Sequence, residues 1–346
     1  SGIYYKPGSL KARNCRRGLR MMLDFCAEHG VAHEVCGKVI VATREDELPA
    51  LERLHERGVA NGVQCRLIGP EELAEYEPHA AGIRAIHVAE AGIADYKGVC
   101  AALARLIGAA GSEIKTGARV RSMTRDGGSV VLHTAGGDVR TRRVINCGGL
   151  HSDRVARLTG TRPGVRIVPF RGEYYMLNDR AAGLVRNLIY PVPDPRYPFL
   201  GVHFTRMIGG HVECGPNAVL ALAREGYSWG KVNVRDLLGV LASPGFWRFA
   251  ARHWRMGLGE MHRSLSKRAF VESLRRLVPE VGMDDIEPAE AGVRAQAMRP
   301  SGDLLDDFSI QTSPGVVNVC NAPSPAATSS LSIAETIADH VEGMQT

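Results

Sequence analysis

Two side chains of this sequence have the chemistry to act on a small molecule that carries a carboxylate. His203 lies on an expected strand, and an imidazole that titrates near neutral pH can take the proton of a hydroxyl group. Arg294 lies on another expected strand among small residues, where its planar guanidinium can hold a carboxylate through two hydrogen bonds. Plainer interpretations stay open for both: a histidine that is only hydrogen-bonded in place, and a structural salt bridge from Arg294 to Glu290 or Asp303.

Three more polar side chains belong to the middle of the chain. Arg171, Tyr190 and Arg206 are spread over residues 165–219, a mainly extended stretch that proline-rich loops interrupt. Arginines bind anions through charge-assisted hydrogen bonds. The three residues are therefore further candidates for contacts with a substrate.

A glycine turn and a loop of small residues could approach a cofactor. Residues 143–146 form an expected strand that runs into Gly148 and Gly149, and glycines let a backbone come close to a phosphate or a flavin. Residues 321–330 form a stiff loop before the last expected helix, whose N-terminus carries partial positive charge. A tight turn and an ordinary capped helix are the alternatives. The cap would be Thr328, Ser329 or Ser330.

Composition and absent motifs exclude several classes of protein. The 346 residues carry a formal charge of +6, and 45% are apolar, which is ordinary for a globular protein. No apolar run approaches the roughly 18 residues that span a bilayer, and no signal peptide is visible. The eight cysteines are scattered, without a C-x-x-C pair or a histidine cluster, which argues against zinc and disulfides and favours the cytoplasm. No nucleic-acid, Walker, G-x-S-x-G or H-E-x-x-H motif occurs.

The densest basic stretch, residues 252–268, mixes arginine, histidine and lysine with Trp254 and Met256. A solvated helix face is the simpler interpretation of such a stretch. The alternative is a patch that contacts an anionic membrane from the cytoplasmic side.

Caps and periodicity predict a mixed α/β fold. Helices and strands alternate along the chain except for the extended middle, which indicates a discontinuous α/β domain with a second, antiparallel domain inserted. The expected domains are 1–32, 90–165 and 275–346 for one, and 33–89 and 166–274 for the other. Helices are expected over 9–28, 43–57 (opened by a capping box at Thr43 and Asp46), 95–110, within 233–278 and over 330–341, and strands over 38–42, 118–123, 129–134, 138–140, 143–146, 290–297 and 316–319.

Seven segments together resemble one family. They cover nearly the whole chain in the order of that family, and their number and length make the resemblance specific. The chain resembles the L-2-hydroxyglutarate oxidases and dehydrogenases, within the D-amino-acid-oxidase-like flavoproteins. The segments are residues 1–11, 167–174, 189–193, 199–206, 215–221, 291–297 and 321–330.

The resemblance implies an FAD-binding Rossmann-like domain interleaved with a substrate domain built on a mixed or antiparallel sheet. It implies that Arg294 holds a substrate carboxylate and that Gly148 and Gly149 approach the cofactor phosphates. Val120 would meet the adenine side through its backbone. Ser1, Gly2 and the loop residues Asn321, Ala322, Pro323, Ser324, Thr328, Ser329 and Ser330 would lie along the flavin ring.

One departure from the family pattern bears on the cofactor. The family opens with a strand, a G-x-G-x-x-G turn and a helix, and no G-x-G-x-x-G occurs in these 346 residues. We therefore expect an N-terminally truncated chain that binds FAD poorly or not at all, whereas its full-length parent would bind it.

The implied reaction is oxidation of L-2-hydroxyglutarate to 2-oxoglutarate, with reduction of FAD and electrons passing to a quinone or to O₂. The substrate is a dicarboxylate and needs two cationic contacts: Arg294 for C1, and Arg171 or Arg206 with help from Tyr190 for the distal carboxylate. His203 is the expected base. Rival interpretations are an amino-acid oxidase, a glycerol-3-phosphate dehydrogenase and an inactive fragment; the oligomeric state stays open.

Overall fold

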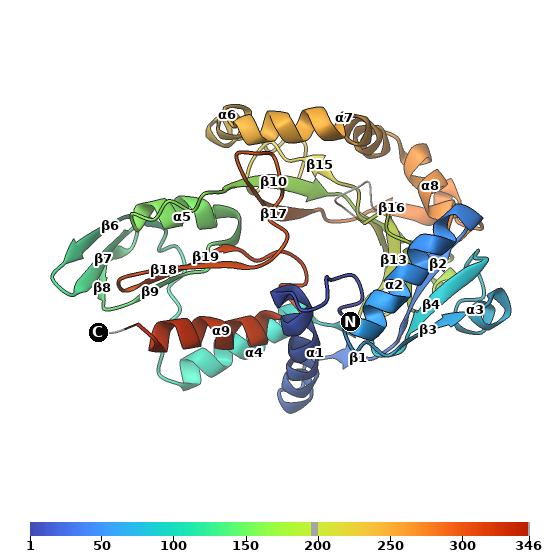
Figure 1. The fold of residues 1–346 in the computed structure, drawn as a ribbon, viewed down its shortest axis with the longest axis horizontal. Coiled ribbons are helices and arrows are strands. Elements are labelled where there is room, and N and C mark those ends of the chain that lie inside the picture. The colour runs from blue at the N-terminus through green and yellow to red at the C-terminus, as the bar shows by residue number, and fades with distance from the viewer. Residues whose placement is uncertain (195–199, 345–346) are drawn as a thin grey trace.

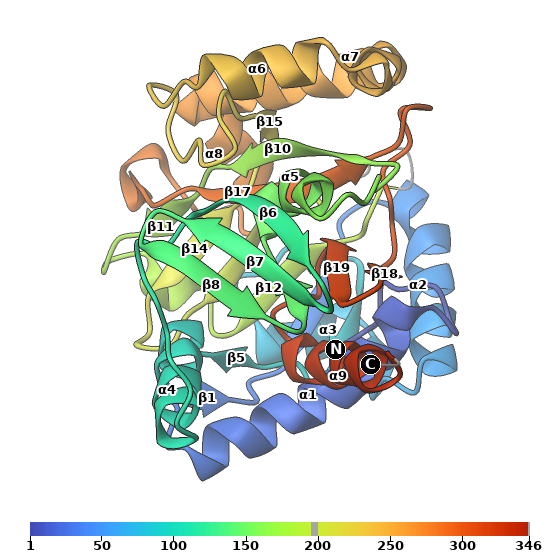
Figure 2. The ribbon, with the colours of Figure 1, turned by 90° about the vertical axis from the view of Figure 1, so that its left-hand side faces the viewer.

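The computed structural model describes residues 1–194 and 200–344, so Phe199 at the start of one resembling segment lies outside the described residues. The views in Figures 1 and 2 show a large sheet and its helices at one end, a smaller group of strands and helices at the other, and α6 and α7 along one edge. The mixed α/β fold class expected from the sequence is confirmed.

The described strands form one large mixed sheet in the order β16-β11-β14-β13-β12-β2-β4-β3. Within it β12 runs parallel to β2, and the other neighbouring pairs are antiparallel. Every residue of β2 is buried, because both faces of that strand are covered by apolar clusters. The bounds are β2 Lys38–Ala42, β3 Cys65–Ile68, β4 Arg84–Val88, β11 Tyr175–Leu177, β12 Leu188–Pro191, β13 His203–Arg206, β14 Val212–Gly215 and β16 Ile286–Pro288, with helices α2 Leu48–Ala60, α3 Pro70–Tyr76 and α8 Lys267–Arg275 beside them.

A second sheet of described strands is centred on β10 (Arg166–Gly172), which pairs with β15 (Val219–Leu220) and along its whole length with β17 (Gly292–Met298). Helices α6 (Val234–Leu241) and α7 (Pro244–Leu265) cover it, and Val240 and Phe249 pack against its apolar residues. The β10–β17 pairing joins residues that were expected to lie in different domains. The same is true of β16, which was expected in one domain but pairs with β11 of the other in the large sheet.

The parallel strands β9 (Val144–Asn146) and β19 (Val316–Asn321) form a third sheet with β18 (Ser309–Ser313). Asn146 donates to Asn318 across this pair, at 2.9 Å, and fixes its register from within the core. Around the sheet lie helices α5 (Ser152–Leu158) and α9 (Ser330–Glu342) and the hairpin sheet of β6 (Val120–Asp126), β7 (Ser129–Thr134) and β8 (Gly137–Thr141).

Helices α1 (Leu10–Glu28) and α4 (Tyr96–Ala109) begin where their capping residues predict. The hydroxyl of Ser9 accepts from the backbone of Ala12, and Asp95 accepts from the backbone of Lys97. The short pair β1 (His33–Glu34) and β5 (Ile93–Ala94) joins the segments that follow and precede these helices.

Two expected caps are wrong. The capping box of Thr43 and Asp46 does not form, because Glu47 rather than Asp46 accepts from the backbone of Thr43, and α2 starts only at Leu48 after a short 3₁₀ turn. At α9 the N-cap position is Ser329, but its hydroxyl makes no capping hydrogen bond.

Candidate active site

His203 and Tyr190 lie on neighbouring strands of the large sheet and stack on each other. Their ring centroids are 4.1 Å apart with an angle of 23° between the ring planes. The antiparallel pairing of β12 with β13, with Ile189 opposite Phe204, places the two side chains on the same face. Two candidates from separate sequence segments therefore meet in one cluster.

The imidazole of His203 has one nitrogen hydrogen-bonded and the other available to accept a proton. Its Nδ1 lies 3.0 Å from the carbonyl oxygen of Gly201, so Nδ1–H donates and Nε2 keeps its lone pair. Burial, with smaller effects from the positive charges of Arg294 and Lys38, lowers the pKa of His203 from 6.5 to about 4. The ring is therefore neutral at physiological pH.

This pKa predicts how kcat/KM depends on pH on the acid side. The pH dependence of kcat/KM reports the pKa values of essential groups in the free enzyme. A lowered pKa means that protonation starts only when the pH falls toward 4, so kcat/KM should stay level down to about pH 5. A histidine at its ordinary value would lose activity from about pH 7 downward. Steady-state assays from pH 5 to 8 check this, and an inflection near 6.5 would contradict it.

Arg294 lies on β17, opposite Phe170 of β10. Its positive charge acts on Tyr174, where burial raises the pKa of the phenol and Arg294 opposes that rise. The same charge contributes to the lowered pKa of His203. Arg294 and His203, which are far apart in sequence, are thus electrostatic neighbours.

Arg171 and Arg206 each have a carboxylate partner. Arg171 is 1% exposed, donates to Glu173 at 2.8 Å and lies over the ring of Trp229 at 4.3 Å. Arg206 donates to Glu34 at 2.5 Å. Both guanidinium charges are therefore largely neutralised within the protein.

Lys38, at the start of β2, was missed by the sequence analysis. Its ammonium lies over the rings of Tyr4 and Tyr190, 4.7 and 4.8 Å from their centroids. The signal in the sequence is a lysine directly followed by the apolar run of residues 39–42. From the sequence alone such a lysine indicates only the start of a strand, whereas the fold places it over Tyr190, on which His203 stacks.

The loop of residues 321–330 is held against α1. Asn321 donates to the carbonyl oxygens of Leu305 and Asp307, at 2.9 and 2.8 Å. Gly18 of α1 allows the close approach, since a Cβ there would lie 2.7 Å from the Cα of Ser329. The carboxylate of Asp307 in turn accepts from the first N–H groups of α1, so loop and helix form one unit.

A cavity of about 270 Å³ adjoins this loop and the glycine turn. Two buried oxygens near it, Oδ1 of Asn321 and Oγ of Ser329, have no hydrogen-bond partner among the described residues. Such atoms are costly to bury unless a ligand satisfies them. The residues present therefore fit the expected flavin. The lining includes Cys147, Gly149, Ser152, Asn321, Ala322, Ala326 and Ser330.

Ser1 and Gly2 lie next to the same unit. Arg16 of α1 donates to the carbonyl oxygen of Ser1, and a side-chain hydrogen bond links the nearby Tyr5 to Ser324. Thr328 lies 3.3 Å from the hydroxyl of Tyr96. Val120 lies on the hairpin strand β6 and is not part of this cavity lining. Of the expected cofactor residues, Gly149, Asn321, Ala322 and Ser330 thus line this cavity.

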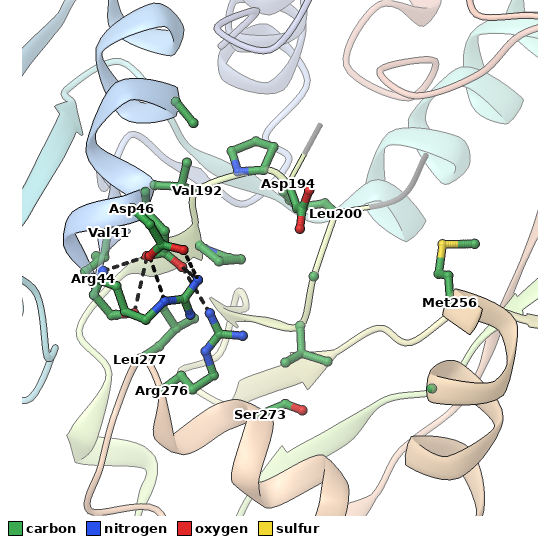
Figure 3. Close-up of a pocket in the computed structure, with 18 of the residues that line it drawn as sticks. Val41, Arg44, Asp46, Val192, Asp194, Leu200, Met256, Ser273, Arg276 and Leu277 are labelled. Atoms are coloured by element: carbon green, nitrogen blue, oxygen red, sulfur yellow. Dashed lines mark hydrogen bonds and ion pairs between the residues drawn. The ribbon is translucent and has the colours of Figure 1, made fainter. Parts of the chain in front are cut away.

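A larger cavity, of about 620 Å³, lies elsewhere, between the end of β2 and helices α7 and α8. Figure 3 shows Arg44 and Arg276 reaching toward the same acidic side chains. Glu47 pairs with both arginines, at 3.1 and 3.0 Å. Of the described residues that line this cavity, none is a predicted catalytic residue.

The described residues contain no cluster of His, Cys, Asp or Glu that could hold a metal ion. No helix in that part of the chain is long and apolar enough to cross a membrane.

Comparison with known sequences gives matches over nearly the whole of this chain. Residues 1–340 match the sequence model of a family described as FAD dependent oxidoreductase. The chain is 48% identical to an L-2-hydroxyglutarate dehydrogenase of Indibacter alkaliphilus, over 98% of this chain and 86% of that protein. It is 43% identical to the enzyme of that name from Escherichia coli K12 (99% and 81%) and 40% identical to the mitochondrial one of Homo sapiens (99% and 78%).

Solved structures show the same fold at low identity. An L-α-glycerophosphate oxidase of Mycoplasma pneumoniae with FAD bound superposes with a TM-score of 0.79 at 18% identity, over 99% of this chain and 82% of that chain. A glycine oxidase of Geobacillus kaustophilus gives 0.71 at 17% identity, with the same coverage.

Proposed function

We propose that this chain, which belongs to the family of FAD-dependent oxidoreductases, oxidises L-2-hydroxyglutarate to 2-oxoglutarate. The observation that carries the substrate is the identity of 40–48%, over at least 98% of this chain, to proteins named L-2-hydroxyglutarate dehydrogenase. The glycerophosphate and glycine oxidases share the fold, but their identity to this chain is too low to indicate that it acts on the same substrates.

In the proposed reaction Arg294 binds the C1 carboxylate through two charge-assisted hydrogen bonds. Nε2 of His203 takes the proton of the C2 hydroxyl, and the stacked ring of Tyr190 holds the imidazole in place. Bound FAD supplies the acceptor for the hydride that leaves C2. The glycine turn and the loop of residues 321–330 hold the cofactor, through backbone groups, Asn321 and Ser329.

Product analysis tests this function. The FAD-loaded enzyme is incubated with a dye acceptor and with L-2-hydroxyglutarate, its D-enantiomer, glycerol 3-phosphate or glycine. We expect 2-oxoglutarate from the L-enantiomer alone. Faster turnover of glycerol 3-phosphate or an amino acid than of L-2-hydroxyglutarate would show that the proposed substrate is wrong.

The proposed electron acceptor is a membrane quinone, which the enzyme reaches through the outer face of α7. The helix has a kink at His253, and after the kink exposed apolar residues recur at the spacing of one helical face, among them Trp254 at 56% and Leu265 at 72% exposure. Arg255 lies over Trp254, and further arginines flank the row. Exposed tryptophans beside arginines suit the interface of an anionic membrane. This outer stripe consists of Trp254, Leu258, Met261 and Leu265.

Replacing Trp254 and Leu258 with serine should weaken binding to phosphatidylglycerol vesicles at least about tenfold, since each buried apolar side chain contributes about 1.5–3 kcal/mol. Val59→Ser, at a residue 56% exposed on α2, is the matched control. Co-sedimentation measures the binding. Equal binding of both variants, or no binding by the unaltered protein at low salt, would count against the membrane face and would leave O₂ as acceptor.

A further inference from the structure

Lys38 carries a buried charge that no protein carboxylate balances. The residue is 7% exposed, and among the described residues its ammonium makes no ion pair and no hydrogen bond. The rings of Tyr4 and Tyr190 offset part of the cost of burial by cation–π attraction. A buried ammonium still requires a counter-charge, because removing it from water is expensive.

The position of Lys38 connects it to the base. Its ammonium contacts one face of the unit formed by Tyr190 and His203, whose rings are stacked. Both Lys38 and Arg294 act through their charge on His203. The imidazole is therefore influenced by two cations that come from different sheets, β2 of the large sheet and β17 of the second.

A dicarboxylate substrate needs two such cations. Arg294 provides one, and Arg171 and Arg206 already have Glu173 and Glu34 as partners. Breaking either pair to bind substrate would leave a protein carboxylate without its partner. Lys38 has no such pair to lose.

We propose that Lys38 binds the distal carboxylate of the substrate, so that it selects a dicarboxylate over a 2-hydroxy acid with an apolar tail. The inference rests on the proposed function and names the residue that would give it specificity. In a substrate held by Arg294 at C1 and by Lys38 at the far carboxylate, the C2 hydroxyl lies next to the C1 end, and both cations act through their charge on His203. The ammonium donates hydrogen bonds and undergoes no chemical change.

Binding of the product and of a matched analogue tests the inference without turnover. Calorimetry on the oxidised enzyme compares 2-oxoglutarate with 2-oxopentanoate, which has a methyl group in place of the distal carboxylate. For Lys38→Met we expect 2-oxoglutarate to bind about 10- to 100-fold more weakly, the effect of one hydrogen bond to a charged group. Binding of 2-oxopentanoate should change less than about twofold. Lys38→Arg should recover part of the loss.

A second measurement uses the unaltered protein, in case the variants do not fold. Burial lowers the pKa of Lys38 from 10.5 to about 8, so its ammonium loses its charge as the pH rises through that value. We expect calorimetry between pH 7 and 9 to show that the affinity for 2-oxoglutarate falls with rising pH more than the affinity for 2-oxopentanoate. An equal pH dependence for both ligands, or equal losses of both affinities in Lys38→Met, would overturn the inference. If the unaltered enzyme neither binds 2-oxoglutarate nor oxidises L-2-hydroxyglutarate, the proposed function itself fails.

Discussion

Replacing Arg294 with alanine should lower kcat/KM for L-2-hydroxyglutarate by about 10²- to 10⁴-fold. Two hydrogen bonds to a charged group contribute about 1.5–3 kcal/mol each, and each 1.4 kcal/mol corresponds to a factor of ten. The loss should be mainly in KM, because the carboxylate charge is the same in substrate and transition state. Steady-state kinetics with the FAD-loaded enzyme measure it.

Two variants make this result specific. Arg294→Lys keeps the charge but not the planar pair of donors, so it should recover only part of the activity. Arg299→Ala, at an exposed position just beyond β17, removes an arginine from the same region and should leave kcat/KM unchanged. If Arg294→Ala and Arg299→Ala behave alike, Arg294 does not bind the substrate.

Replacing His203 with glutamine should slow reduction of the flavin at saturating substrate by about 10²- to 10⁴-fold, the usual contribution of a general base. Glutamine can still fill the space beside Tyr190 and hydrogen-bond, but it cannot take a proton. Anaerobic stopped-flow absorbance measures the rate of reduction directly. The loss should be in this rate, whereas affinity for 2-oxoglutarate should change little.

His211→Gln is the matched control, because His211 is an exposed histidine between β13 and β14 of the same sheet. It should reduce flavin at the unaltered rate. Reduction of His203→Gln within about tenfold of the unaltered enzyme would be far less than a base contributes and would remove His203 from that role.

Local sequence signals predicted the elements well. Ser9 and Asp95 cap helices where expected, since a cap depends only on the backbone a few residues away. The hairpin of β7 and β8 follows from its glycine turn for the same reason. Ser329 shows the limit of such signals: its hydroxyl could cap α9, but tertiary packing buries it without a partner.

The environment of each site residue was harder to predict. Arg206 pairs with Glu34, which lies 172 residues away in sequence, and no local pattern reveals that contact. The contact of Lys38 with Tyr190 depends on the parallel pairing of β2 with β12, which the local sequence does not reveal. Residue types and family segments thus indicated the reaction, whereas the balance of charges around the base could be seen only in the folded structure.

The most direct test of the account is the visible absorption spectrum of the FAD-loaded enzyme before and after anaerobic addition of L-2-hydroxyglutarate. We expect the flavin band to bleach, the D-enantiomer to leave it unchanged, and 2-oxoglutarate to form in an amount equal to the flavin reduced. A band that persists with L-2-hydroxyglutarate but bleaches with glycerol 3-phosphate or an amino acid would contradict it, and would leave the fold and cofactor with another substrate.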